Sequence, residues 1–266
     1  MRIIITLFLL TFGSVPVEMQ VQATEEHAFI EQPHVAIIID DLGDRFKDGR
    51  RVIQLPANLT VGIIPYTPFA KRLASLANKK NKEILLHLPM ESVNHKHLGK
   101  AGLHSHMTEN ELLTSLYESL SSVENIRGVS NHMGSQLTQD NKIMQWLMNG
   151  LQLHGGLYFV DSRTISTSQA KTVASEVGLE HASRDVFLDH DPKNIHKQWA
   201  YMLKLAKQKG SAIAIGHPYP ETIAFLKTAL PELQQQGVKL VSVSNLIRWR
   251  QTRGKLAWQT QKSSSR

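Results

Sequence analysis

The stretch Val35-Ala-Ile-Ile-Ile-Asp-Asp-Leu-Gly43 decides the fold, because five apolar residues run directly into two adjacent aspartates and a glycine. An apolar run of this length, rich in β-branched residues, is typical of a strand buried on both faces of a parallel sheet. The carboxyl ends of such strands form the rim on which α/β folds place their chemistry. We therefore predict that Asp40 and Asp41 lie on a functional rim.

Four further apolar runs end in the same way. They are 83–86 before His87, 128–130 before Asn131-His132, 157–160 before Asp161, and 212–215 before Gly216-His217. Strand-like runs also lie at 60–64 and 239–243, and helix-like stretches fill most of the gaps. Functional-looking residues follow at least five separate strands, whereas an open sheet concentrates them near a switch point. We predict an α/β fold, a distorted (β/α) barrel of about seven parallel strands.

The helices have clear start signals. Thr108-Glu-Asn-Glu111 is a capping box before an apolar helical stripe, and a second stripe lies at 143–151. Asp191-Pro192 predicts the start of a third helix, and a fourth is expected over 221–236.

The N-terminus predicts export. Arg2 precedes an apolar stretch at 3–12 that is too short to span a bilayer, and Val21-Gln-Ala23 offers a cleavage site. We interpret residues 1–23 as a signal peptide and 24–33 as a polar lead-in. No later segment is long and apolar enough to cross a membrane, so we expect an exported protein, in the periplasm of a Gram-negative bacterium.

Composition sets further bounds. The chain has 266 residues, 41% hydrophobic and 20% charged, which fits one α/β domain over 34–248. It contains no cysteine, so disulfides and thiolate zinc sites are excluded. The net charge of +7 is unchanged by loss of 1–23. We expect the basic segment 249–266 to be a disordered tail; attraction to anionic envelope polymers is the alternative. No nucleic-acid motif is present.

The aspartate pair is the first candidate site. Adjacent carboxylates repel each other unless a cation or proton intervenes, and carboxylates beside imidazoles suggest a divalent metal. One of Asp40 and Asp41 could bind the metal while the other acts as a base; a helix cap plus a solvated acid is the alternative. His87 lies between leucines and could instead be a satisfied core residue. Glu91, four residues on, could reach the same site.

Other rim residues carry open alternatives. Glycines flank the Asn131-His132 pair and permit a close backbone approach to a ligand. His217 stands in a Gly/Pro-rich loop, which suits a general acid. Asp161 could be a ligand, a carboxylate that orients a histidine, or an ion-pair partner. Arg184-Asp185, with Asp189 nearby, could orient the acid or base or form only an ion pair. We interpret the remaining loop histidines as solvated: His95, His97, His104 and His106.

At these residues the chain resembles the divergent polysaccharide deacetylase family, a branch of the NodB-like carbohydrate esterases. The resemblance covers roughly 34–247. It rests on six motifs in order: Ile39-Asp-Asp-Leu-Gly43, Leu86-His-Leu-Pro-Met-Glu91, Asn131-His-Met-Gly-Ser135, Phe159-Val-Asp-Ser162, Arg184-Asp-Val-Phe-Leu-Asp189 and Ile215-Gly-His-Pro218.

The resemblance implies a distorted (β/α) barrel with one divalent metal, usually zinc. Carried over, Asp40 is the base, Asp41, His87 and His132 are the ligands, and His217 is the acid. The main branch of the superfamily has its two metal histidines four residues apart. Here Glu91 stands at that spacing, so the second histidine must come from elsewhere, and His132 is the best candidate. The main branch's arginine motif is not recognisable.

These observations predict a metal-dependent hydrolase that removes acetyl groups from a glycan of the cell envelope. One alternative is a non-catalytic envelope protein that binds a glycan or a protein partner and retains the metal site. A weaker alternative is metal-dependent phosphoester hydrolysis.

Overall fold

The computed structural model describes residues 32–264, and the side chains of helical residues from 255 onward are not described. The predicted signal peptide 1–23 and most of the lead-in 24–33 lie outside the described residues.

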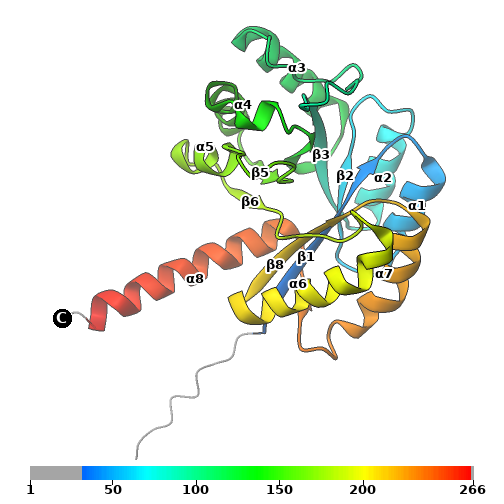
Figure 1. Cartoon of the computed structure of the whole chain (residues 1–266), viewed down its shortest axis with the longest axis vertical. Helices are drawn as coiled ribbons and strands as arrows, with labels where there is room; N and C mark the ends of the chain where they lie inside the picture. Colours follow the sequence, from blue (N-terminus) through cyan, green and yellow to red (C-terminus); the bar gives the residue numbers. More distant parts are fainter. Residues whose placement is uncertain (1–31, 265–266) are drawn as a thin grey trace, which may run out of the picture. The chain divides into compact units, whose positions relative to one another are not determined.

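The core of the fold is a curved, all-parallel sheet (Figure 1). Its strands follow the order β6-β5-β4-β3-β2-β1-β8-β7, and the short β9 pairs with the start of β1. The strands are β1 (His34–Leu42), β2 (Thr60–Ile63), β3 (Glu83–Met90), β4 (Ile126–Met133), β5 (Tyr158–Asp161), β6 (His181–Ser183), β7 (Val186–Phe187), β8 (Ser211–Gly216) and β9 (Lys239–Leu240).

The predicted distorted (β/α) barrel is confirmed, and each of the seven predicted runs overlaps an observed strand. The sequence reading missed β6 and β7, which have three and two residues and therefore carry little periodicity. These two short strands are the two ends of the pairing path, so the barrel remains open between them.

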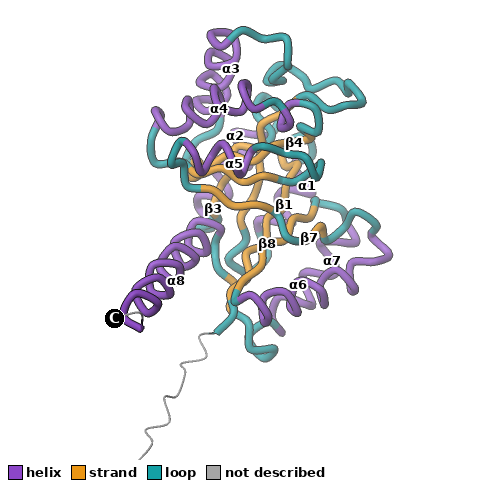
Figure 2. Tube along the Cα trace, turned by 60° about the vertical axis from the view of Figure 1, so that its left-hand side comes forward, coloured by secondary structure: helices purple, strands orange, loops and turns teal. Residues whose placement is uncertain are grey.

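Helices surround this sheet (Figure 2). They are α1 (Phe46–Ile53), α2 (Ala70–Lys79), α3 (Glu109–Ser122), α4 (Asn141–His154), α5 (Ala170–Glu176), α6 (Ile195–Lys209), α7 (Pro220–Glu232) and α8 (Val243–Ser264). The predicted capping box is present, since the Thr108 side chain accepts from the Glu111 amide and the Glu111 carboxylate accepts from the Thr108 amide. Asp191 caps a 3₁₀ turn, Pro192–Asn194, after which α6 begins.

Strand residues alternate between two apolar clusters. Ile38 and Leu85 belong to a smaller cluster inside the barrel, whereas their neighbours Ile39 and Leu86 pack in the larger cluster that includes the helices. Side chains of a strand point alternately to opposite faces. Counting every second residue from the inner cluster, which we call the parity of a strand position, therefore predicts which polar residues at the strand ends point inward.

The amino-terminal end of the barrel is closed by the start of α8. Val243, Leu246 and Ile247 belong to the inner cluster. The Glu83 carboxylate accepts hydrogen bonds from the Tyr158 hydroxyl at 2.8 Å and from the Ser244 amide in the first turn of α8 at 3.1 Å. A carboxylate at this position accepts a hydrogen bond from an amide that has no partner within the helix. The positive end of the helix dipole also stabilises its negative charge.

The prediction of a disordered tail from residue 249 is wrong, because α8 continues to Ser264. Arg250 contacts Asp185 at 3.2 Å and donates to the Ser211 hydroxyl at 2.9 Å, and these contacts hold the helix to the strand ends. The basic composition of residues 249–266 alone did not predict these contacts of Arg250. Among the described residues, no helix is both long and apolar enough for a membrane span.

Candidate metal centre and active site

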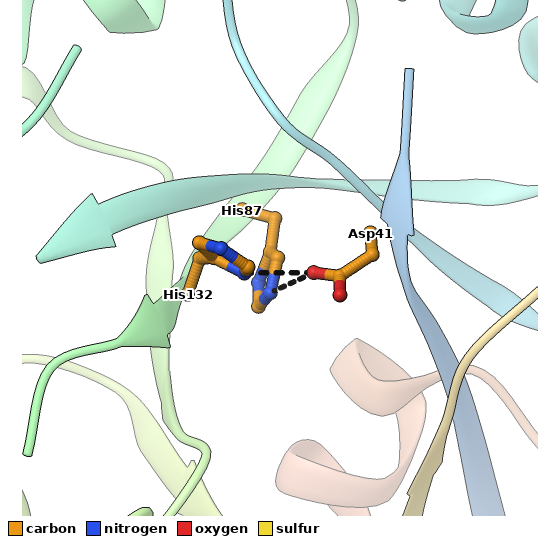
Figure 3. A group of neighbouring side chains, drawn as sticks. All are labelled: Asp41, His87 and His132. Carbon is orange, nitrogen blue, oxygen red and sulfur yellow. Dashed lines mark ion pairs between the residues drawn. The ribbon is translucent and has the colours of Figure 1, made fainter. Parts of the chain in front are cut away.

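Three predicted ligands meet at the carboxyl-terminal rim (Figure 3). Nδ1 of His132 lies 2.7 Å from Oδ1 of Asp41, and Nε2 of His87 lies 3.1 Å from the same oxygen. All three ligand atoms are within 4.8 Å of one another. Among residues 32–254, whose side chains the structure describes, this is the one group of histidine and acidic side chains with such spacing.

The donor set fits a divalent metal. Two imidazoles and one carboxylate are a common zinc set with a position left open for water or substrate. Oδ1 of Asp41 is buried and has no hydrogen-bond partner among the described residues, although both imidazoles are close. The three ligand atoms are therefore close enough together to bind one cation.

Backbone strain brings Asp41 into this group. Inward-pointing Asp40 follows Ile38 on β1, so a regular strand would turn Asp41 to the outer face. Asp41 instead has φ of 60°, a left-handed conformation that an aspartate tolerates at some cost. Met133, next to His132, has φ of 56°. Strain of this kind at strand ends is typical of sites where side-chain direction matters.

The register of β3 and β4 orients His87. His87 pairs with Ser130, and Nδ1 of the imidazole lies 2.7 Å from the Ser130 hydroxyl. This contact leaves Nε2 directed at Asp41, as a metal ligand requires. Ser130 was not predicted, although it stands two residues before His132 and therefore shares its inward face.

Asp40 is enclosed. It is 1% exposed, and both carboxylate oxygens lack a hydrogen-bond partner among the described residues. Burial raises the pKa of Asp40, while the imidazole of His87, with Nδ1 3.5 Å away, opposes that shift. Asp41 differs: burial favours its neutral form, but contacts with His132 and His87 outweigh burial and hold its pKa well below the usual range.

Gly62 makes room for the Asp40 carboxylate. A Cβ at this position of β2 would lie 1.9 Å from Oδ1 of Asp40. The sequence reading missed Gly62, although a glycine inside a buried strand is a known signal of close approach.

His217 follows β8 directly and faces the group. Its Nε2 lies 3.7 Å from Oδ2 of Asp41. Asp189 holds the ring from behind, with Oδ1 2.9 Å from Nδ1, and its Oδ2 accepts from the His217 amide and the Thr222 hydroxyl. Burial alone would lower the pKa of His217, but the Asp189 hydrogen bond and the charge of Asp41 outweigh it and raise the pKa. Thr222 is a further residue that the sequence did not indicate.

Two predicted neighbours of the metal organise loops instead. Glu91 accepts from the Ser105 amide at 2.7 Å and contacts His95 at 3.2 Å, so it ties down the loop after β3. Asn131 accepts from the Ser162 amide and donates to the Met133 carbonyl, so it joins the loops after β4 and β5.

Three further candidates form hydrogen bonds with backbone groups near the rim. Asp161 has the same parity as Phe159, which packs in the outer cluster, and its carboxylate accepts from the Arg163 amide. Arg184 donates to the carbonyls of Ser162 and Arg163. Asp185 accepts from the Ile213 amide and pairs with Arg250 on α8.

Comparison with known proteins identifies the family. Residues 37–247 match the family model described as "Divergent polysaccharide deacetylase". An uncharacterized protein of Haemophilus influenzae is 36% identical over 221 residues, which cover 82% of this chain and 78% of the relative. The uncharacterized protein YibQ of Escherichia coli is 34% identical over 215 residues, covering 80% and 67%.

A solved structure shares the fold. The crystal structure of the uncharacterized protein ATU2773 from Agrobacterium tumefaciens superposes with a TM-score of 0.78 at 24% identity, covering 81% of this chain and 89% of that one. The six motifs, the parallel barrel and the family match agree: this chain belongs to the divergent polysaccharide deacetylase family.

Proposed function

We propose that this chain is an exported, metal-dependent hydrolase that removes acetyl groups from a glycan of the cell envelope. The observation that carries the proposal is the convergence of Asp41, His87 and His132 between a buried carboxylate, Asp40, and a tethered imidazole, His217. Family membership supplies the substrate class. The predicted signal peptide at 1–23 supports export.

Asp41, His87 and His132 would hold the metal, with zinc the ion that best suits two imidazoles and a carboxylate. A divalent metal there supplies Lewis-acid polarisation of an acyl carbonyl.

Asp40 would act as the general base. As water adds to the acetyl carbon, the Asp40 carboxylate takes a proton from that water. Both of its oxygens lack a hydrogen-bond partner among the described residues, so they are available to accept that proton.

His217 would act as the general acid. When the C–N bond breaks, Nε2 of His217 gives its proton to the departing amine, and acetate is released. Asp189 keeps Nδ1 bonded, so that Nε2 faces the reaction, and it stabilises the charged imidazolium.

Elemental analysis of zinc-loaded protein, followed by acetate release from N-acetylated glycans, tests this proposal. We expect about one metal per chain and acetate release that is lost in Asp40→Asn and His217→Gln. Asp191→Asn is a matched control, because asparagine also caps a turn and Asp191 lies on the exposed 3₁₀ segment. Stoichiometric metal without acetate release would contradict hydrolysis and favour a binding protein.

A further inference from the structure

The ring of Tyr219 lies beside the proposed acid. It is 45% exposed, and its centroid lies 5.5 Å from that of His217, with 28° between the ring planes. His217 is also in contact with Phe187, whose ring centroid is 5.3 Å away. One face of Tyr219 therefore covers the imidazole, and much of the rest of the ring is open to solvent.

Two prolines restrict the backbone that carries this ring. Tyr219 stands between Pro218 and Pro220, and it caps α7 with φ of −71° and ψ of 146°. A residue before proline is restricted to this extended region, so little backbone entropy remains to be lost when a ligand binds. An exposed aromatic ring beside the proposed acid offers apolar area that a bound ligand could cover.

The position of the ring limits what can lie on it. An amine that receives a proton from Nε2 of His217 must come within about 3 Å of that atom. The ring that carries the amine then lies within reach of the neighbouring tyrosine face. A pyranose has C–H groups on its faces and hydroxyls on its edge, so it can cover an aromatic ring while its edge stays hydrated.

We propose that Tyr219 is a stacking platform for a pyranose ring of the glycan, and that it contributes binding energy at the sugar beside His217. This inference rests on the proposed function for its substrate class. It makes Tyr219 a contact for the sugar ring, distinct from the groups that act on the acetyl.

Binding of a pentamer of N-acetylglucosamine to the zinc-loaded full-length protein tests this platform, by calorimetry and without reference to turnover. We expect Tyr219→Ala to bind about tenfold more weakly, the scale of one aromatic stacking contact, and Tyr219→Trp to bind like wild type. Tyr201→Ala is the matched control, since Tyr201 is 49% exposed on the outer helix α6. Equal binding by wild type and Tyr219→Ala, or no binding by wild type, would overturn the platform.

Steady-state kinetics distinguish stacking of Tyr219 on the sugar from a role of Tyr219 in positioning the His217 imidazole. With the pentamer, Tyr219→Ala should raise KM about tenfold. With 4-nitrophenyl acetate, which has no sugar, Tyr219→Ala should not raise KM. A fall in kcat with both substrates and a shifted pH profile would instead make Tyr219 a support for the imidazole and overturn the platform. Pentamer binding that depends on Tyr219 without acetate release would contradict the hydrolase and leave the platform intact.

Discussion

The carboxylate of Asp40 on β1 occupies the space that a side chain at Gly62 of β2 would need. A Cβ on residue 62 would lie 1.9 Å from Oδ1 of Asp40 and 3.0 Å from its carboxylate carbon. The absence of a side chain on one strand is therefore what permits a buried carboxylate on the next. This relationship separates the proposed base from the proposed ligands, because the three atoms nearest to that Cβ all belong to Asp40.

Gly62→Ala should displace the Asp40 carboxylate and lower kcat for acetate release at least tenfold, while zinc stoichiometry stays near one per chain. Overpacking at a buried site also costs about 1–3 kcal/mol of unfolding free energy, which thermal unfolding would measure. Gly254→Ala is the control, since a Cβ there meets nothing within 4 Å. Unchanged kcat in folded Gly62→Ala would contradict the role of Asp40 as the base.

Asp41→Ala should abolish stabilisation by zinc. A ligand that binds the folded state alone adds about 2.7 kcal/mol at a hundred times its dissociation constant. Wild type should therefore show a clear rise in Tm on zinc addition, whereas Asp41→Ala should show none. Asp44→Ala is the control, because Asp44 is an exposed aspartate three residues after Asp41, and its Tm should rise with zinc as in wild type. An equal rise in Asp41→Ala would remove Asp41 from the ligand set.

Asp189→Asn should narrow the pH range of activity. Asp189 raises the pKa of His217, so the proton needed by the leaving amine is retained to higher pH. Without that charge the pKa of His217 falls, and the alkaline limb of kcat/KM should move to lower pH. Profiles of kcat/KM against pH for wild type, Asp189→Asn and the Asp191→Asn control measure the shift. An unmoved alkaline limb would show that Asp189 does not tune the acid.

The rim was predictable because its signals are local. Apolar runs that lead into Asp or His identified the four strands that carry Asp40, His87, His132 and Asp161, and the strand that His217 follows. Along β5, Phe159 packs in the outer cluster and Val160 in the inner cluster, so alternation predicts that Asp161 points outward. The same count would have turned Asp41 outward, although its left-handed φ of 60° brings it into the ligand group, so counting alternate positions does not by itself identify the site residues.

Other parts of the site depend on pairing between distant segments. Ser130 meets His87 through strand register, Gly62 meets Asp40 across neighbouring strands, and Thr222 reaches Asp189 from the first turn of α7. A single sequence does not contain register. The same reason explains the error over 249–266, where ion pairing of Arg250 with Asp185 holds a helix that composition alone does not indicate.

Tyr158 should make the fold sensitive to alkali. Burial, followed by the nearby charge of Glu83 and the hydrogen bond to it, raises the pKa of Tyr158 well above its ordinary value of about 10. The neutral phenol therefore stabilises the folded state fully below about pH 10, and this contribution is lost as pH rises above it, by up to about 1.4 kcal/mol per pH unit. Tyr158→Phe should show a shallower fall in unfolding free energy above pH 10 than wild type.

At neutral pH, Tyr158→Phe should cost only about 1 kcal/mol, because Glu83 keeps its hydrogen bonds from Thr60 and Ser244. Denaturant unfolding between pH 7 and pH 11 measures both effects. Tyr201→Phe, at an exposed position, controls for loss of a phenol as such and should follow the wild-type curve. If Tyr158→Phe lost stability as steeply as wild type above pH 10, the sensitivity would have to arise elsewhere than at the closed end of the barrel.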